Sequence, residues 1–284
     1  MKARYPKIDY SQVRPDWSPH REFAHSVNAS STIPAFVEPW LIKVFKKAKA
    51  LLPAENFELH RRVDIFIAQE AQHYRQHAAF NRRIREDYPE IVPFEKQIEA
   101  DYADMLENRS LKFCMAYSEG FESMGPVAAV MWFEKYDRYL EGADDAAVLL
   151  WKWHMAEEYE HREVCFQLFR ALYARTLWGR FWNGWLYRCY GFYSALKHLG
   201  AYSSKVSNAL IAVDQTRMAP ADAVRSKEAH GEFRAFMKKQ TLPQLAKVLS
   251  PFYDPANKPE PKGWREFLSR FEKGGDVAHS GSQL

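Results

Sequence analysis

The 284-residue sequence lacks several features that mark large classes of protein. It has only three cysteines, Cys114, Cys165 and Cys189, whose odd number and irregular spacing argue against a disulfide framework and suit a reducing compartment. No apolar run reaches the roughly 18 residues of a membrane-spanning helix. The N-terminal stretch "MKARYPKIDYSQVRPDW" has no apolar core of a signal peptide. We therefore expect a cytoplasmic protein.

Several catalytic and binding motifs are missing as well. The sequence has no G-x-S-x-G elbow, no P-loop and no Rossmann fingerprint, which excludes several classes of enzyme. The formal net charge of +4 is mild, and no basic run carries base-stacking aromatic residues, so we expect no nucleic-acid partner. Alternating strand patterns are also lacking, and apolar residues recur at helical spacing almost throughout. The sequence predicts an all-α protein.

One stretch, "WKWHMAEEYEHREV" at residues 151–164, is rich in histidine and glutamate. At 3.6 residues per turn, His154, Glu158 and His161 fall within an arc of about 60° on one helix face. Apolar residues surround this face, so a solvated surface explains it poorly. Imidazole and carboxylate groups are donors that suit iron, zinc or manganese. The spacing therefore indicates a metal-binding helix.

A second stretch, "FIAQEAQHYRQH" at residues 66–77, repeats the E-x-x-H pattern. Glu70, His73 and His77 share an arc of about 60° on their helix. Two E-x-x-H helices, together with one glutamate from each of two further helices, form the dinuclear site of a four-helix bundle. We predict such a bundle, in which His77 is either a partner of the ligands or a core histidine.

The two remaining carboxylates must come from other helices. Glu38 lies in the apolar stretch "SSTIPAFVEPWLIKVF", where an unpaired buried carboxylate would be costly. Glu119 and Glu122 lie one helical turn apart in "KFCMAYSEGFESMGPVAAVMW", so spacing alone does not choose between them. Pro126 lacks an N–H group and favours a kink beside residue 122.

These motifs resemble the bacterial family labelled predicted metal-dependent hydrolases, a ferritin-like group. The resemblance rests on "FIAQEAQHYRQHAAFN", "AYSEGFESMG" and "WKWHMAEEYEHREVCFQLF", and covers roughly residues 25–175. The family pattern has a glutamate followed two positions later by an aromatic residue, which implies Glu119 rather than Glu122. Family members show a Pro-x-Gly-Glu run where this chain reads "IPAFVEPW". The helix of residues 151–164 also resembles that of the dinuclear iron arylamine N-oxygenases, which have a third metal-bound histidine where His154 stands.

From these patterns and resemblances we predict a ferritin-like four-helix bundle with additional C-terminal helices, holding two metal ions. Iron is the expected metal, with manganese or zinc as alternatives. The predicted ligands are Glu38, Glu70, His73, Glu119, His154, Glu158 and His161. The predicted partners of these ligands are His77, Glu122 and Glu157.

Three functions compete for this site. The main expectation is a di-iron oxidase or oxygenase, which would use O₂ and an electron donor to oxidise an apolar or aromatic small molecule. The alternative is a metal-dependent hydrolase that uses a metal-bound water. The third is a non-catalytic metal-binding bundle. The sequence gives no prediction of the oligomeric state.

Composition divides the chain into four parts. We expect an extended arm over residues 1–25, the metal-binding bundle over 26–175, a C-terminal helical extension over 176–272 and a disordered tail over 273–284. Helices are predicted over about 35–51, 55–87, 94–140 with a break near Asn108, 144–174 and 205–239.

Aromatic residues crowd the segment 178–199. This segment either packs on the bundle, covers an apolar substrate channel or rests on a membrane. We expect a substrate lid formed by Trp178, Trp182 and Trp185. Arg180, Arg188 and Lys197 would then lie on the solvent side, where they could also touch anionic lipid at the inner membrane face.

Overall fold

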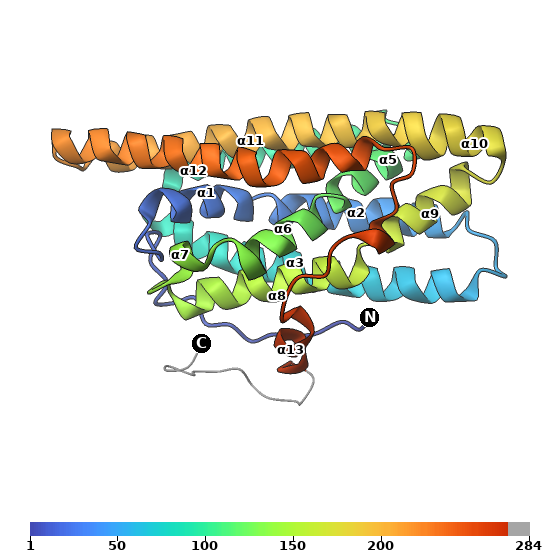
Figure 1. The fold of residues 1–284 in the computed structure, drawn as a ribbon, viewed down its shortest axis with the longest axis horizontal. Coiled ribbons are helices and arrows are strands. Elements are labelled where there is room, and N and C mark those ends of the chain that lie inside the picture. Colours follow the sequence, from blue (N-terminus) through green and yellow to red (C-terminus); the bar gives the residue numbers. More distant parts are fainter. Residues whose placement is uncertain (272–284) are drawn as a thin grey trace.

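The computed structural model describes residues 1–271, and every regular element within them is helical (Figure 1). The predicted all-α class is therefore confirmed. The predicted disordered tail, residues 273–284, lies outside the described residues. Among residues 1–271, no helix combines the length and apolar character that crossing a lipid bilayer requires.

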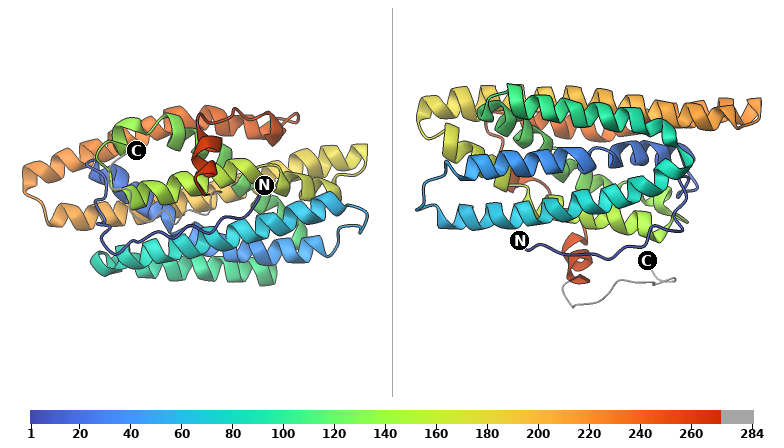
Figure 2. Two further views of the ribbon diagram at one scale, coloured as in Figure 1. Left: turned by 90° about the horizontal axis from the view of Figure 1, so that it is seen from below. Right: turned by 180° about the vertical axis from the view of Figure 1, so that it is seen from behind.

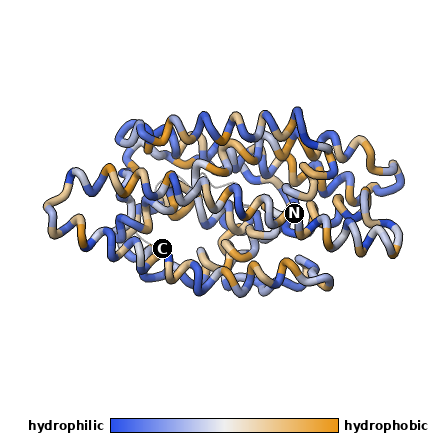
Figure 3. Tube along the Cα trace, turned by 90° about the horizontal axis from the view of Figure 1, so that it is seen from above, coloured by the Kyte–Doolittle hydropathy of each residue, from blue (hydrophilic) through white to orange (hydrophobic). Residues whose placement is uncertain are grey.

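The bundle consists of four helical segments, two of which are interrupted. They are α2 (Pro34–Lys49), α3 (Phe57–Asp87), α5 (Leu111–Glu122) continued by α6 (Gly125–Glu134), and α8 (Asp145–His161) continued by α9 (Val164–Tyr173). A short loop joins α2 to α3, and the two helices lie side by side (Figures 1 and 2). Apolar and polar residues alternate along the helices (Figure 3), as expected for helices that each bury one face.

The remaining helices surround this bundle. They are α1 (Arg21–Ser31), η1 (Pro89–Ile91), α4 (Val92–Asn108), α7 (Asp137–Leu140), α10 (Leu177–Phe181), the π-helical η2 (Trp182–Tyr187), α11 (Arg188–Thr216), α12 (Pro220–Ala246), η3 (Lys247–Leu249), η4 (Pro255–Asn257) and α13 (Trp264–Ser269). The long helices α11 and α12 form a layer across one side of the bundle (Figure 1). The predicted break near Asn108 is confirmed, because α4 ends there.

Two expectations about the C-terminal part were wrong. A single helix over 205–239 does not form, because the chain turns after Thr216 and Pro220 starts α12 at its first position. Arg188 does not face solvent, because only 1% of its surface is exposed. The helix that carries it lies directly on α5, and a Cβ added to Gly191 would collide with the backbone of Ala116. Glycine therefore allows α11 to approach α5 closely.

Residues 1–20 form an extended arm along α3 and α8 (Figure 2). The predicted arm reached residue 25, whereas α1 begins at Arg21. Tyr10 donates a hydrogen bond to Gln76 Oε1 at 2.9 Å, and Gln76 Nε2 donates to Pro6 O at 2.8 Å. The backbone N–H of Asp144 donates to Trp17 O at 2.7 Å. These contacts fix the arm along its length.

Candidate metal centre

Four helices bring two groups of buried donors together at the centre of the bundle. The first group is Glu38, His73, His154 and Glu158, and the second is Glu70, Glu122, Glu158 and His161. Within each group, one donor atom from every residue lies within 4.8 Å of the others. Because Glu158 belongs to both groups, its carboxylate is placed to bridge two ions.

Helix ends help to position the second group. Helix α5 ends at Glu122, and α6 begins at Gly125 with Pro126 in its first turn. Proline cannot donate to the carbonyl of residue 122, so the predicted kink occurs at this ligand candidate. Helix α8 ends at His161, where Arg162 turns back and donates to Tyr159 O at 2.7 Å. That second break follows no proline, and the sequence did not predict it.

Gly125 gives Glu158 its space. A Cβ added to Gly125 would lie 2.5 Å from Glu158 Oε2 and 3.2 Å from Glu158 Cβ. A methyl group at this position would therefore force the Glu158 side chain to move, and a side chain buried on all sides has little room to do so. The break between α5 and α6 therefore places a residue without a side chain against the shared carboxylate.

The three histidines face the carboxylates with one ring nitrogen each. His154 Nε2 lies 3.4 Å from Glu38 Oε1 and 3.1 Å from Glu158 Oε1. His161 Nε2 lies 3.3 Å from both Glu122 Oε2 and Glu158 Oε1, and 3.4 Å from Glu70 Oε1.

His73 uses the other ring nitrogen toward the centre. Its Nδ1 lies 3.7 Å from both Glu70 Oε1 and Glu158 Oε1. Its Nε2 lies 3.0 Å from Glu157 Oε2, and Arg4 Nη1 donates to Glu157 Oε1 at 2.9 Å. Burial raises the pKa of Glu157 to about 7, and Arg4 opposes this shift. In its ionised form Glu157 can only accept, so His73 Nε2 then carries the proton and Nδ1 keeps its lone pair for the centre.

His154 is oriented by a chain of hydrogen bonds that ends on α1 and α3. Ser31 Oγ donates to Asn81 Oδ1 at 2.7 Å, so it accepts from His77 Nδ1 at 2.8 Å. His77 Nε2 must then accept from His154 Nδ1, at 2.7 Å. His154 Nε2 is left unprotonated toward the carboxylates.

His161 is also oriented by a hydrogen bond from its outer ring nitrogen. Its Nδ1 lies 3.2 Å from Gln69 Oε1, while Gln69 Nε2 donates to Glu160 Oε2 at 2.8 Å. The amide oxygen therefore accepts from Nδ1, and Nε2 is the nitrogen that faces the carboxylates. Each of the three histidines thus has one nitrogen bonded outside the centre and the other directed into it. This is the arrangement in which histidines bind metal ions.

Several buried atoms at the centre have no hydrogen-bond partner among residues 1–271. These are both carboxylate oxygens of Glu38, Glu70 and Glu122, together with His73 Nδ1 and His161 Nε2. Buried polar groups are normally satisfied, and unsatisfied ones are costly. Two divalent ions would satisfy these atoms, and their four positive charges would offset the four carboxylates. The donor set therefore fits two metal ions, without identifying the metal.

A comparison with known protein families agrees with this geometry. The model of one family, described as predicted metal-dependent hydrolase, matches residues 2–258. The chain belongs to this family. The match extends well beyond the residues 25–175 on which the sequence resemblance rested. No curated protein and no solved structure matches the chain.

Burial makes the charged forms of the donors unfavourable without a cation. Burial raises the pKa of Glu38 well above its usual range, and the nearby Glu158 and Glu122 raise it further. The pKa of Glu70 is also raised well above its usual range, first by burial and then by Glu38. Burial and Glu158 raise the pKa of Glu122 to about 7. A bound cation would reverse these shifts.

Glu158 and His161 behave differently. Burial acts to raise the pKa of Glu158, but the charge of His161 outweighs it and holds the pKa well below its usual range. Burial acts to lower the pKa of His161, but Glu158 and Glu122 outweigh it and raise the pKa. The metal-free centre therefore keeps a charged Glu158 beside a cationic His161, and a metal ion would replace that proton.

The structure places Glu122, not Glu119, among the donors. Glu119 lies one turn earlier on α5 and faces α11, where its Oε1 is 3.6 Å from Arg188 Nη1 and accepts from Ser123 Oγ at 3.0 Å. The family pattern favoured Glu119 because of Phe121, and that choice disagrees with this geometry. The other six predicted ligands all belong to the two groups.

The three residues predicted as partners of the ligands lie at the centre. His77 bonds His154 and Glu157 bonds His73, whereas Glu122 lies among the donors themselves. Sequence reasoning missed Arg4 and Gln69. Gln69 directly precedes Glu70, so its position next to a ligand candidate was visible, whereas nothing local marks Arg4.

The three tryptophans of the predicted lid differ from one another. Trp178 is 74% exposed and Trp182 is 57% exposed, so neither is a core residue. Trp185 is half-buried, and its Nε1 donates to Leu249 O at 2.9 Å. These contacts describe the outer surface of the segment, and the role of a substrate lid stays a prediction.

Proposed function

We propose that the chain is a dinuclear metal-dependent hydrolase. The observation that supports it is the set of three histidines, each with one nitrogen hydrogen-bonded outward and the other directed at carboxylates that share Glu158. The family match points to the same class of reaction. Two bound divalent ions would supply a polarised substrate oxygen and a water of lowered pKa.

The roles of the chain's own residues follow from their contacts. Glu38, His73 and His154 would hold one ion, and Glu70, Glu122 and His161 the other. Glu158 would bridge them. Glu157 would keep the proton of His73 on its outer nitrogen, and His77 would do the same for His154, so that the inner nitrogen of each ring stays available.

O₂-dependent oxidation by two iron ions is the second candidate. The observation that favours it is the carboxylate-rich donor set, which suits iron as well as manganese. An apolar or aromatic small molecule would be the substrate, and an electron donor would be required. Both candidates use the same ligands and differ in their need for O₂.

The test is to measure metal content and turnover together. Purified protein would be assayed with chromogenic carboxylic and phosphoric esters, after loading with iron, manganese or zinc, in air and under anaerobic conditions. We expect hydrolysis that requires bound metal, continues without O₂ and is lost in Glu158→Gln. Glu163→Gln is the matched control, because Glu163 lies on the same stretch outside the centre. O₂ consumption without hydrolysis would support the oxygenase, and a chain that binds no metal would exclude both.

A further inference from the structure

One line of large apolar side chains lies exposed along α10, η2 and the first turns of α11. We name it the aromatic face, and it comprises Trp178, Trp182, Leu186, Tyr190 and Tyr193, with 74%, 57%, 37%, 51% and 59% of their surface exposed. The residues follow one another at intervals of four or three. Because η2 is a π-helix with wider turns, this spacing keeps them on one side of the segment.

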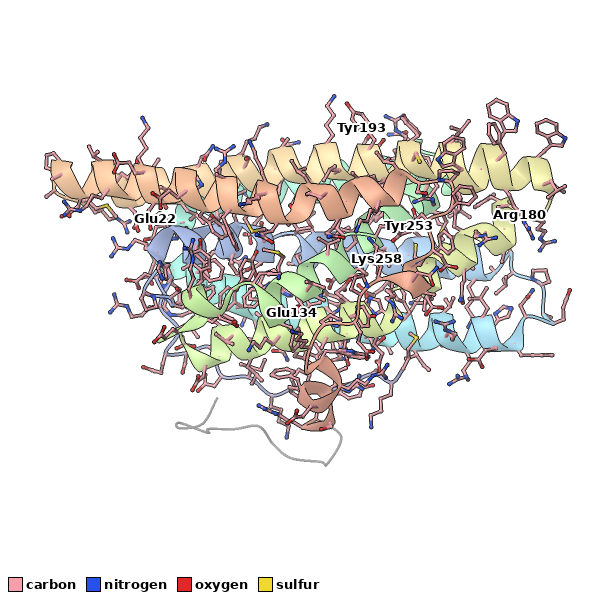
Figure 4. All side chains as sticks on the ribbon, viewed as in Figure 1. Glu22, Glu134, Arg180, Tyr193, Tyr253 and Lys258 are labelled. Carbon is pink, nitrogen blue, oxygen red and sulfur yellow. The ribbon has the colours of Figure 1, made fainter. Side chains whose placement is uncertain are left out.

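The inner side of the same segment is fixed to the protein. Trp185 donates to Leu249 O, and Arg188 Nη2 donates to Ser250 O at 3.3 Å. These bonds hold the loop after α12 beside the segment, and in that loop Leu249 and Phe252 are 45% and 90% exposed. The aromatic face is therefore rigidly presented and extended by a second apolar element. Figure 4 shows Tyr193 on the outer side of α11 and Arg180 at the end of the molecule.

The segment that carries the aromatic face has no acidic residue of its own. The sequence contains no aspartate or glutamate between residues 164 and 213, whereas Arg175, Arg180 and Lys197 are exposed there. Two acidic residues come from neighbouring elements. Asp101 Oδ2 of α4 lies 3.2 Å from His198 Nε2, and the Asp254 carboxylate accepts a hydrogen bond from the backbone N–H of Ala256. Exposed apolar residues flanked by cations, on a segment without acidic residues, suit a binding surface that has an apolar interior beneath an anionic outer layer.

We propose that the aromatic face docks on the surface of an anionic lipid bilayer. Tryptophan and tyrosine rings settle at the level of the lipid headgroups, because one end of each ring is apolar and the other polar. Arg175, Arg180 and Lys197 would reach the phosphates. A second copy of the chain fits less well, because a symmetric contact would bring the same cations together. The proposal does not rest on the chemistry of the metal centre.

The test is sedimentation with vesicles of phosphatidylcholine alone and of phosphatidylcholine mixed with phosphatidylglycerol. We expect binding to the anionic vesicles only, with a blue shift of the tryptophan fluorescence. Trp178→Ser with Trp182→Ser should weaken binding at least about tenfold. Arg180→Gln with Lys197→Gln should weaken it about 25-fold, or about fivefold for each charge.

Two controls lie on the other side of the bundle from α11. Tyr5→Ser removes an aromatic side chain that is 68% exposed, and Arg75→Gln removes an exposed cation of α3, so both should bind like the unmodified chain. Equal binding to neutral and anionic vesicles, or no binding, would overturn the proposal. A concentration-dependent dimer that Trp178→Ser with Trp182→Ser dissociates would show instead that a second copy covers the face. If the tryptophan variant misfolds, the charge variant decides.

Discussion

At the scale of single residues, Glu119 and Glu122 differ sharply although they lie one turn apart. Glu122 meets His161 and the other donors, whereas Glu119 meets Arg188. We expect Glu122→Gln to lower metal stoichiometry, because a ligand candidate loses its charge. Glu119→Gln should keep the metal but lower the free energy of unfolding by about 2 kcal/mol, because a buried arginine loses its counter-charge. Metal analysis and urea unfolding of both variants separate the two roles, and the reverse result would restore Glu119 as the ligand.

Gly125 offers a second test, because it touches no metal itself. Gly125→Ala places a methyl group against Glu158, so we expect the variant to fold yet lose metal affinity. Gly200→Ala is the matched control, since a Cβ at Gly200 meets nothing within 4 Å. That change should stabilise α11 by about 1 kcal/mol and leave metal binding unchanged. Equal metal content in both variants would show that Glu158 has room to move.

Local patterns predicted most of the donors and could not predict the rest. Helical periodicity placed His154, Glu158 and His161 on one face, because that arrangement depends only on the geometry of a single helix. The choice between Glu119 and Glu122 depends on which side of α5 is covered by α11, and that contact is long-range. Arg4 lies 153 residues from Glu157 in the sequence, so no local pattern could join them.

At the scale of elements, the N-terminal arm supports the centre from outside. Arg4 bonds Glu157, which in turn orients His73. We expect Arg4→Gln to speed the loss of metal to a chelator and to weaken metal affinity about tenfold or more, because such outer partners hold ligands in place. Arg14→Gln, at an exposed position of the same arm, should have no effect. Unchanged metal release in Arg4→Gln would show that the arm has no part in holding His73.

The segment after α12 carries a lysine with an unusual environment. Burial, and then the charges of Lys247 and Arg188, lower the pKa of Lys258 to about 8 from its ordinary 10.5. Figure 4 places it near Tyr253, on the side where this segment crosses the bundle. Between these two values the unfolded chain binds more protons than the folded one, so the free energy of unfolding rises with pH. Lys258→Met should flatten this rise, which urea unfolding between about pH 8 and pH 10 would measure. Parallel pH profiles for both proteins would contradict the assignment.

The fold of the whole molecule was predicted where apolar spacing was regular. The bundle helices appear close to their predicted bounds, while the turn between α11 and α12 was missed because Pro220 starts a helix there rather than ending one. The break after His161 was missed for a related reason. The Arg162 side chain donates a hydrogen bond to the carbonyl oxygen of Tyr159, and no sequence pattern predicts this contact.

Metal binding and the stability of the whole molecule are linked. The carboxylates of Glu38, Glu70 and Glu122 are buried without hydrogen bonds, so the metal-free chain carries a destabilised centre. Metal present at about 1,000 times its Kd should raise the free energy of unfolding by about 4 kcal/mol. Calorimetry before and after chelation would measure this as a lower Tm that returns on adding metal. Glu158→Gln should show little change on chelation, and a Tm insensitive to metal in the unmodified chain would contradict the prediction.

The carboxylate that belongs to both donor groups has a consequence for how the centre fills. An ion in either half would fix Glu158 and displace the proton of His161, so the other half would receive a pre-oriented ligand. We therefore expect the two ions to bind with positive cooperativity and a reciprocal coupling. A metal titration would follow one steep sigmoidal isotherm, in which chains holding a single ion are scarce at every concentration.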